Sequence, residues 1–242
     1  MRLVSDIRIV NVVSTAELAT AHSLPLVAPI NLRAISDNLL KNNCIDSVKY
    51  KPDKFIAAIL KQTCPIKSTC LLFESGKFVC LGKSYYCSIS LAHNFKKNII
   101  GTKSVTDSLL AVEAFANKIF EASTEIRASQ LSPHTSALSA SPRKEANRCF
   151  TNFKVSNIVA SSSMGHSIDL LALEKASTSP REVIFTPERF PGLKMTLYPY
   201  SKSNITAIIF YSGKFNITGL KSEEQAEEAH VFLRRKLLKF VK

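Results

Sequence analysis

Residues 210–215 have the sequence Phe-Tyr-Ser-Gly-Lys-Phe, and residues 73–78 have the nearly identical sequence Phe-Glu-Ser-Gly-Lys-Phe. A second motif also occurs twice at nearly the same interval, as Tyr-Lys-Pro-Asp-Lys-Phe at 50–55 and as Phe-Thr-Pro-Glu-Arg-Phe at 185–190. Two separate motifs that recur at almost one interval indicate an internal duplication. The fold is therefore expected to contain the same supersecondary unit twice.

Weaker matches extend the duplication and set the domain boundaries. Asn11-Val-Val matches Asn157-Ile-Val, and Gly101-Thr-Lys-Ser matches Gly219-Leu-Lys-Ser. The segment between the repeats is rich in Ser, Ala and Pro and poor in β-branched and aromatic residues, which predicts a linker that does not pack. The predicted boundaries are 1–121 for the first repeat, 122–148 for the linker and 149–242 for the second repeat, with insertions in the first repeat near 16–30 and 84–100.

Each repeat has the same predicted order of secondary structure. A short apolar strand is followed by a helix, then by strands with tight Ser-Gly-Lys turns, and finally by a longer amphipathic helix. Ser222 with Gln225 three residues later forms a capping-box motif, which marks the start of the last helix. Two such half-sheets can join edge to edge with four helices on one face, giving an α+β fold whose other face is open. The opening strands are predicted at 8–15 and 152–160, the next helices at about 31–41 and 168–177, and the closing helix of the first repeat at about 104–120.

The composition favours a protein that binds a polyanion. The net charge of +13 favours nucleic acid first and an anionic membrane second, with a basic protein that has neither partner as the alternative. Hydrophobic residues make up 45% of the chain, which is enough for a sizeable core. No apolar run approaches the roughly 18 residues that span a bilayer, and early charges argue against an N-terminal signal sequence. The six cysteines lack metal-binding spacing and are predicted to be free thiols.

Five segments of the chain form a recognisable set: Phe150-Thr-Asn-Phe-Lys-Val-Ser-Asn-Ile-Val, Pro187-Glu-Arg-Phe-Pro-Gly-Leu, Ile208-Ile-Phe-Tyr-Ser-Gly-Lys, Lys51-Pro-Asp-Lys-Phe and Leu72-Phe-Glu-Ser-Gly-Lys. Together they resemble the core domain of the TATA-binding protein family. The resemblance covers nearly the whole chain apart from the linker and the insertions. It implies a saddle in which two pseudo-symmetric repeats form one curved antiparallel sheet with four helices on the convex face. It also implies binding in the minor groove of A·T-rich promoter DNA with a bend of about 80°, which is a property of the family.

The resemblance assigns DNA-contacting roles to residues of this chain. A minor groove offers only acceptors at A·T pairs, so a protein binds it through apolar contacts, a few donors such as Asn side chains, and basic groups at phosphates. Phenylalanines at strand ends can act as wedges that open a base step. The predicted wedges are Phe55, Phe73, Phe190 and Phe210; the other predicted contacts are Asn11, Asn157, Val13, Val159, Thr15, Ser161, Val79, Leu81, Thr218, Leu71, Ile208, Ile56, Pro191, Lys61, Lys77, Lys214, Ser75 and Ser212.

Each of these residue types also has an ordinary structural explanation. Asn is common in turns and caps, Phe in cores, Lys on solvated surfaces, and Ser-Gly in tight turns. The chain also departs from the family pattern, because Asn216 is polar where the family is apolar and Thr196 stands where the family has a basic residue. For residues 78–101 two registers compete. We prefer the one in which Val79-Cys-Leu-Gly directly follows Ser-Gly-Lys over the one that uses Asn98-Ile-Ile-Gly, which makes 84–100 an inserted excursion.

The resemblance further implies a nuclear, non-enzymatic transcription initiation factor without a cofactor or metal. Its implied partners are the general transcription factors IIB and IIA, TBP-associated factors and the RNA polymerase machinery. The loop with Pro187, Glu188 and Arg189 is the predicted partner site, although its acidic character is reduced here. The runner-up is a related factor with altered or lost TATA specificity that acts mainly through proteins. An enzyme is the alternative from another class, because the same half-fold occurs fused to glycosylases and ribonucleases, but no catalytic motif supports it.

Overall fold

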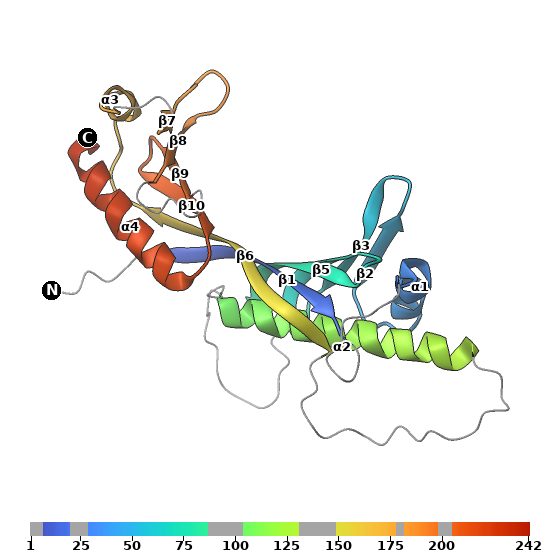
Figure 1. Cartoon of the computed structure of the whole chain (residues 1–242). Coiled ribbons are helices and arrows are strands. Elements are labelled where there is room, and N and C mark those ends of the chain that lie inside the picture. Colours follow the sequence, from blue (N-terminus) through green and yellow to red (C-terminus); the bar gives the residue numbers. More distant parts are fainter. Residues whose placement is uncertain (1–6, 20–28, 87–103, 131–148, 178–181, 198–204) are drawn as a thin grey trace. The chain divides into compact units, whose positions relative to one another are not determined.

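A computed structural model describes residues 7–19, 29–86, 104–130, 149–177, 182–197 and 205–242. The described residues form one antiparallel sheet with the strand order β2-β3-β4-β5-β1-β6-β10-β9-β8-β7, together with four α-helices. This arrangement confirms the predicted α+β class, a single sheet built from two half-sheets (Figure 1). Among the described residues no helix is long and apolar enough to cross a membrane.

The two repeats contain corresponding elements in the same order. In the first repeat they are β1 (Arg8–Leu18), α1 (Leu32–Lys41), β2 (Ser47–Lys51), β3 (Phe55–Gln62), β4 (Ile66–Leu72), β5 (Lys77–Tyr86) and α2 (Val105–Gln130). In the second they are β6 (Phe150–Ser163), α3 (Leu170–Lys175), β7 (Val183–Ile184), β8 (Gly192–Thr196), β9 (Thr206–Phe210), β10 (Lys214–Leu220), α4 (Glu223–Leu237) and the 3-10 turn η1 (Leu238–Phe240).

Contacts divide the chain into two compact units that do not follow the repeats residue for residue. The first-repeat unit contains residues 13–101 and 106–154, and the second-repeat unit contains residues 1–12, 102–105 and 155–242. The boundary therefore cuts β1 after Val12 and β6 after Lys154, so that each of these long strands contributes to both units. Chain order alone does not predict this exchange, because it depends on which strands pair.

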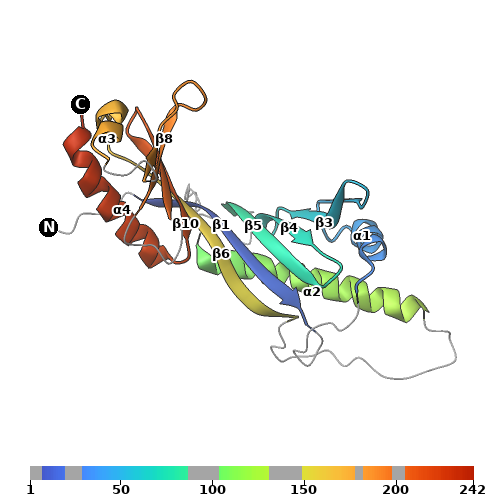
Figure 2. The ribbon, with the colours of Figure 1, turned by 45° about the horizontal axis from the view of Figure 1, so that its top comes forward.

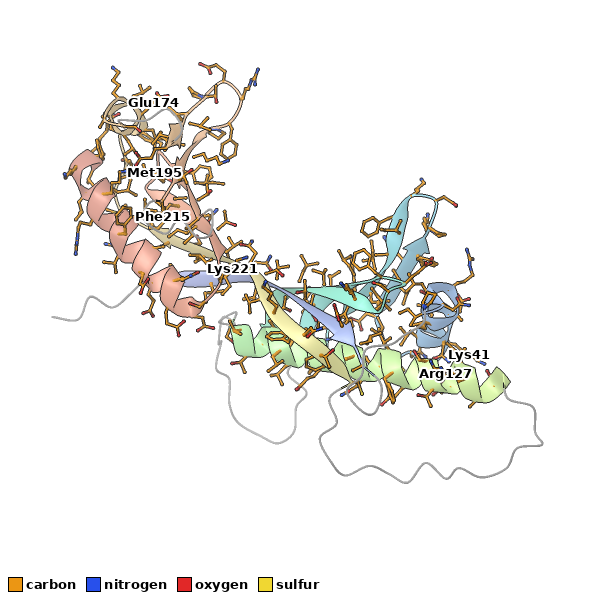
Figure 3. All side chains as sticks on the ribbon, viewed as in Figure 1. Lys41, Arg127, Glu174, Met195, Phe215 and Lys221 are labelled. Atoms are coloured by element: carbon orange, nitrogen blue, oxygen red, sulfur yellow. The ribbon has the colours of Figure 1, made fainter. Side chains whose placement is uncertain are left out.

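In each unit the helices lie along one face of the strands (Figure 2), and each unit has its own cluster of buried apolar side chains. In the second-repeat unit, the fully buried Phe215 and Met195 of the strands (Figure 3) belong to the same core as Ala226, Ala229 and Leu233 of α4. In the first-repeat unit the strand residues that include Leu60, Leu72 and Phe78 pack with the helix residues Leu32, Ile35, Leu39, Val112, Phe115 and Ile119. The helices thus cover one face of the strands in each unit.

Backbone hydrogen bonds repeat at equivalent positions in the two repeats. The Leu18 N–H donates to the Gly76 carbonyl, and the Met164 N–H donates to the Gly213 carbonyl, each at 2.9 Å. Both glycines have φ +78°, the left-handed conformation that glycine adopts without strain. The Ser-Gly-Lys motifs therefore form the same tight turn twice, each tied to the end of the strand that opens its repeat.

The helix starts are also equivalent. Asn31 caps α1 by accepting from the Ala34 N–H, and Asp169 caps α3 by accepting from the Ala172 N–H, both at 3.0 Å. Ser222 caps α4 by accepting from the Gln225 N–H, which confirms the predicted start of that helix. Short polar side chains that satisfy the free N–H groups of a first turn explain why the helices begin at these residues.

The helix α2 is longer than predicted and occupies the start of the expected linker. Its core residue Ala122 is 3% exposed, and Ile126 packs against the same cluster. Ser123 and Thr124 bond back to the carbonyls one turn earlier, at 2.7 and 2.9 Å, so their hydroxyl groups do not disrupt the helix. The linker prediction is thus wrong for residues 122–130, and residues 131–148 lie outside the described chain.

Three smaller predictions are also settled by the structure. The strand β1 runs to Leu18, so the insertion expected from residue 16 begins later. The register of β5 pairs Val79 with Leu71 and Leu81 with Thr69, which confirms the preferred alternative, but the strand continues to Tyr86 before the segment 87–103 that lies outside the described chain. Cys64 is disulfide-bonded, contrary to the prediction of free thiols, whereas Cys44, Cys70, Cys80 and Cys149 are free.

Candidate nucleic-acid interface

In the first-repeat unit, the strand face opposite the helices carries the predicted DNA-contacting side chains. Side chains alternate along a strand, and in β5 Phe78 and Cys80 are buried toward the helices while Val79 and Leu81 are half-buried on the other side. Cross-strand pairs extend this surface from Val79 to Leu71 and on to Ile59. We call this surface the open face of the first repeat; by the same alternation it includes Val13, Thr15 and Lys61.

The second-repeat unit has an equivalent open face. In β10 Phe215 and Ile217 are buried, while Asn216 and Thr218 are half-buried on the opposite side. Asn216 is paired with Ile208, and Ile208 with Lys194, in the neighbouring strands. By the same alternation, the open face of the second repeat also carries Asn11, Asn157, Val159 and Ser161.

The predicted wedge residues lie at or next to the ends of β3, β4, β8 and β9. Phe55 and Phe190, which follow the Pro-acid-base loops, are 42% and 46% exposed. Phe73 and Phe210, which precede the Ser-Gly-Lys turns, are half-buried. The Phe190 and Phe210 rings stand edge to face with centroids 5.9 Å apart. Neither Phe55 nor Phe190 is a core residue, so the structure leaves them accessible to a ligand.

Gly192 allows the aromatic pair of the second repeat to approach the strand. A Cβ at this position would lie 2.5 Å from Cε1 of Phe190 and 3.1 Å from Cε1 of Phe210. The equivalent residue of the first repeat is Ala57, which is 1% exposed. Gly192 belongs to the Phe-Pro-Gly motif in the sequence, but only its position beneath the rings reveals its role.

The Asn157 side chain is held in place by backbone geometry. Its Oδ1 accepts from the Gly219 N–H at 2.8 Å, and its Nδ2 donates to Thr218 Oγ1 at 3.3 Å. Gly219 has φ +93° beside an irregularity in the β10–β6 register. Asn157 thus has a structural role at this irregularity of β10, and the bond to Gly219 fixes the direction of its amide. The bond assignment places the Nδ2 group beside Thr218 on the open face.

The three predicted phosphate-binding lysines are exposed but have different surroundings. Lys77 lies 3.3 Å from Glu17, which also accepts from Asn152 Nδ2 at 2.9 Å. The hydrogen bond from Asn152, and then Lys77, lower the pKa of Glu17, so that its carboxylate stays charged. Lys214 is paired across the strands with Ser163 instead of an acid. The open face of the first repeat is hollowed beside this group by a cavity of about 470 Å³, whose lining includes Thr15, Phe73, Ser75 and Lys77.

The chain is similar to known proteins along nearly its whole length. The model of the family "Transcription factor TFIID (or TATA-binding protein, TBP)" matches twice, over residues 6–95 and 152–240. The chain belongs to the TATA-binding protein family. The two matches also confirm the internal duplication, and membership supports a role as a TATA-box-binding transcription factor.

Individual TATA-binding protein relatives agree with this assignment. The chain is 28% identical to the TATA-box-binding protein of Methanosphaera stadtmanae over 91% of this chain and 87% of that protein. It is 31% identical to TATA box-binding protein-like 2 of Rattus norvegicus over 90% of this chain and 46% of that protein. The solved structure of Methanococcus jannaschii TBP matches with a TM-score of 0.59 and 22% identity, covering 97% of this chain and 99% of that one, which supports the fold.

The partner loop predicted from the TATA-binding protein resemblance is an exposed turn. Pro187, Glu188 and Arg189 are all exposed, and the Arg189 N–H donates to the Thr186 carbonyl at 2.9 Å. The equivalent turn of the first repeat has the same bond, from the Lys54 N–H to the Lys51 carbonyl at 3.0 Å. Ile56 and Pro191, which follow the exposed wedges, are also exposed, as are Ser75 and Ser212 in the Ser-Gly-Lys turns.

The site contains residues that the sequence did not indicate. Glu17 and Asn152 come from different strands and meet beside Lys77, and no motif connects them.

Thr196, the departure from the expected basic residue, is half-buried and paired with Thr206, so this position of the second repeat presents hydroxyl groups. No cluster of potential metal ligands occurs among the described residues.

Proposed function

We propose that this chain is a nuclear transcription initiation factor that binds the minor groove of A·T-rich promoter DNA, bends the duplex and nucleates assembly of the initiation machinery. The observation that supports this most is the common orientation of the predicted contacts. Many strand residues predicted from the resemblance, which include Val13, Leu71, Val79, Ile208 and Thr218, lie on the face that the helices leave uncovered.

Each step of this proposal has a physical basis in the residues. Aliphatic side chains of the open faces can cover the groove floor, and the Asn157 amide can donate to an A·T acceptor. The exposed rings of Phe55 and Phe190 are placed to enter base steps, and the unstacking that this requires costs a few kcal/mol per step. A bent duplex exposes more groove surface to the strands, which offsets that cost. Lysines at the strand ends supply the electrostatic attraction.

Removing both wedges of one repeat tests the proposal. Phe190→Ala combined with Phe210→Ala is expected to weaken binding to an A·T-rich duplex by at least about 100-fold, since full burial of a Phe side chain contributes roughly 1.5–3 kcal/mol. The bend, measured by energy transfer between dyes at the duplex ends, is expected to decrease. Tyr211→Ala is the matched control, because Tyr211 is an aromatic residue beside this pair with 60% exposure and no predicted DNA contact.

The state of the fold decides what a loss of binding means. We expect the thermal transition of the double variant to stay close to that of the original protein. A collapsed transition, with the remaining folded fraction still bending DNA, would show that the two rings stabilise the core and are not wedges.

The proposed assembly role involves the factors IIB and IIA, TBP-associated factors and the RNA polymerase machinery. Its support is family membership together with the exposed loop of Pro187, Glu188 and Arg189. The second candidate is a family member with altered TATA specificity, which the polar Asn216 on the open face favours. Selection of bound duplexes from random sequence separates the two, because only the first predicts strong enrichment of A·T-rich sites.

A further inference from the structure

Equivalent positions on the two open faces differ in chemistry. Val79 follows Lys77 by two residues in β5, and Asn216 follows Lys214 by two residues in β10. Both are half-buried between fully buried neighbours, so both point away from the helices. The duplication therefore places an amide in the second repeat where the first repeat has an isopropyl group.

The surroundings of these two residues differ in the same sense. Val79 pairs with Leu71, and Leu71 pairs with Ile59, which makes an aliphatic row across three strands. Asn216 pairs with Ser161 on one side and with Ile208 on the other. Ile208 is followed in the row by Lys194. The row of the second repeat thus contains three polar side chains and one aliphatic side chain, whereas the three strands of the first-repeat row contribute only aliphatic side chains.

The Asn216 amide is available to a ligand. In the part of the chain that the structure describes, no hydrogen bond satisfies this side chain, whereas the Asn157 amide is held by the Gly219 N–H. A half-buried amide without a partner is costly once a ligand removes its remaining water. A ligand that covers this face is therefore expected to offer Asn216 a hydrogen-bonding group.

In the minor groove, the two kinds of base pair differ in the hydrogen-bonding groups that they offer to Asn216. Every pair offers acceptors, but G·C adds the guanine N2 amino donor. Against Val79 and Leu71 that amino group would lose its water without a partner. Against Asn216 its proton can be accepted by the amide Oδ1, with the Ser161 hydroxyl as a second acceptor.

We infer that the open face of the second repeat accepts a G·C pair where the first repeat requires A·T, and that Asn216 determines this difference. The inference rests on the proposed minor-groove binding and adds a specificity to it. It has a consequence for direction: a duplex with one G·C pair can bind in the direction that places this pair under the second repeat. A duplex with a G·C pair in each half always places one of them under the first repeat.

The experiment uses the whole chain and a set of matched duplexes. The set contains an all-A·T site, sites with one G·C pair at successive positions in one half, and sites with a symmetric pair of G·C substitutions. Each G·C is also made as inosine·C, which removes only the N2 amino group. For the original protein we expect at least one position where a single G·C leaves affinity within about twofold, while the symmetric substitution lowers it about tenfold, or about 1.4 kcal/mol. Inosine is expected to restore it.

Two reciprocal variants identify the residue. Asn216→Val is expected to bind the single-G·C duplex about tenfold more weakly than the all-A·T duplex, with recovery on inosine. Val79→Asn is expected to gain tolerance of the symmetric G·C substitution. Because valine is favourable in strands, Asn216→Val should keep the thermal transition; if it does not, Val79→Asn decides alone.

The possible failures are distinguishable. If the decisive variant discriminates between the G·C-containing and all-A·T duplexes as the original protein does, the inference is overturned, while minor-groove binding remains intact. Tolerance of the symmetric substitution by the original protein, or rejection of every single G·C, would also overturn it. Absence of binding to the all-A·T duplex would overturn both the proposed function and this inference.

Discussion

The two repeats share their backbone framework but differ on the surfaces proposed to meet DNA. The same bonds tie Leu18 to Gly76 and Met164 to Gly213, and the same polar caps begin α1 and α3. On the open faces, however, Val79 corresponds to Asn216, and the ion-paired Lys77 corresponds to Lys214 beside a serine. Turns and caps are constrained by backbone groups that must be satisfied in either repeat. Exposed side chains carry no such requirement, so the differences between the repeats indicate where function diverges.

The largest expected effect is a loss of stability on substitution of Gly213, in the Ser-Gly-Lys turn that both repeats share. A Cβ on Gly213 would lie 1.9 Å from the His166 carbonyl oxygen, and φ is +78°. Gly165 has nearly the same φ, +80°, but a Cβ there would meet nothing within 4 Å. Gly165→Ala is therefore expected to cost only the strain of the left-handed conformation, roughly 1–2 kcal/mol, and Gly213→Ala clearly more. Urea unfolding of both variants measures this, and equal losses would contradict the clash.

Gly192, which lies beneath the Phe190 and Phe210 rings, tests whether the positions of the wedges are set differently in the two repeats. Gly192→Ala is expected to move the Phe190 ring, which is exposed enough to yield, and to lower affinity for an A·T-rich duplex about tenfold, or about 1.4 kcal/mol. Ala57→Gly is the matched change in the first repeat and is expected to leave DNA affinity nearly unchanged while reducing stability by about 0.5–1 kcal/mol. Equal effects on DNA affinity would show that ring position is not set by this contact.

The lysines of the Ser-Gly-Lys turns test whether the two repeats contribute equally to the electrostatic attraction of DNA. Lys214→Ala is expected to reduce the slope of log affinity against log salt by about 0.9, the loss of one phosphate contact. Lys77→Ala is expected to reduce it less, because Glu17 already pairs with Lys77 at 3.3 Å. Titrations at several salt concentrations provide both slopes. A larger change for Lys77 would mean that the Glu17 pair opens when DNA binds.

Substitutions in the partner loops are expected to have the smallest effect on DNA affinity. Glu188→Arg reverses an exposed charge, so DNA affinity is expected to stay within about twofold, while recruitment of a factor-IIB-like protein weakens several-fold. Asp53→Arg makes the equivalent change in the first repeat and is the matched control. A mobility shift with DNA, this protein and the factor measures both. A ternary complex of undiminished affinity would remove the loop of the second repeat from the partner site.

Secondary structure could be predicted where local chemistry decides it. The Ser-Gly-Lys turns, the capping box at Ser222 and the short helices near residues 32 and 170 all depend on residues close in sequence. The end of α2 could not be predicted, because Ala122 and Ile126 are retained in the helix by a core built from distant strands.

The sequence by itself determined the duplication, the α+β class, the family and the alternation that places Val79 and Asn216 on one kind of face. These follow from repeated motifs and from the period of two along a strand. Only the tertiary structure decided that β1 and β6 each contribute to both units, that Asn152 and Glu17 meet Lys77, and that Gly192 lies beneath two rings. These are contacts between segments far apart in the chain, and strand pairing, not local propensity, determines which of them form.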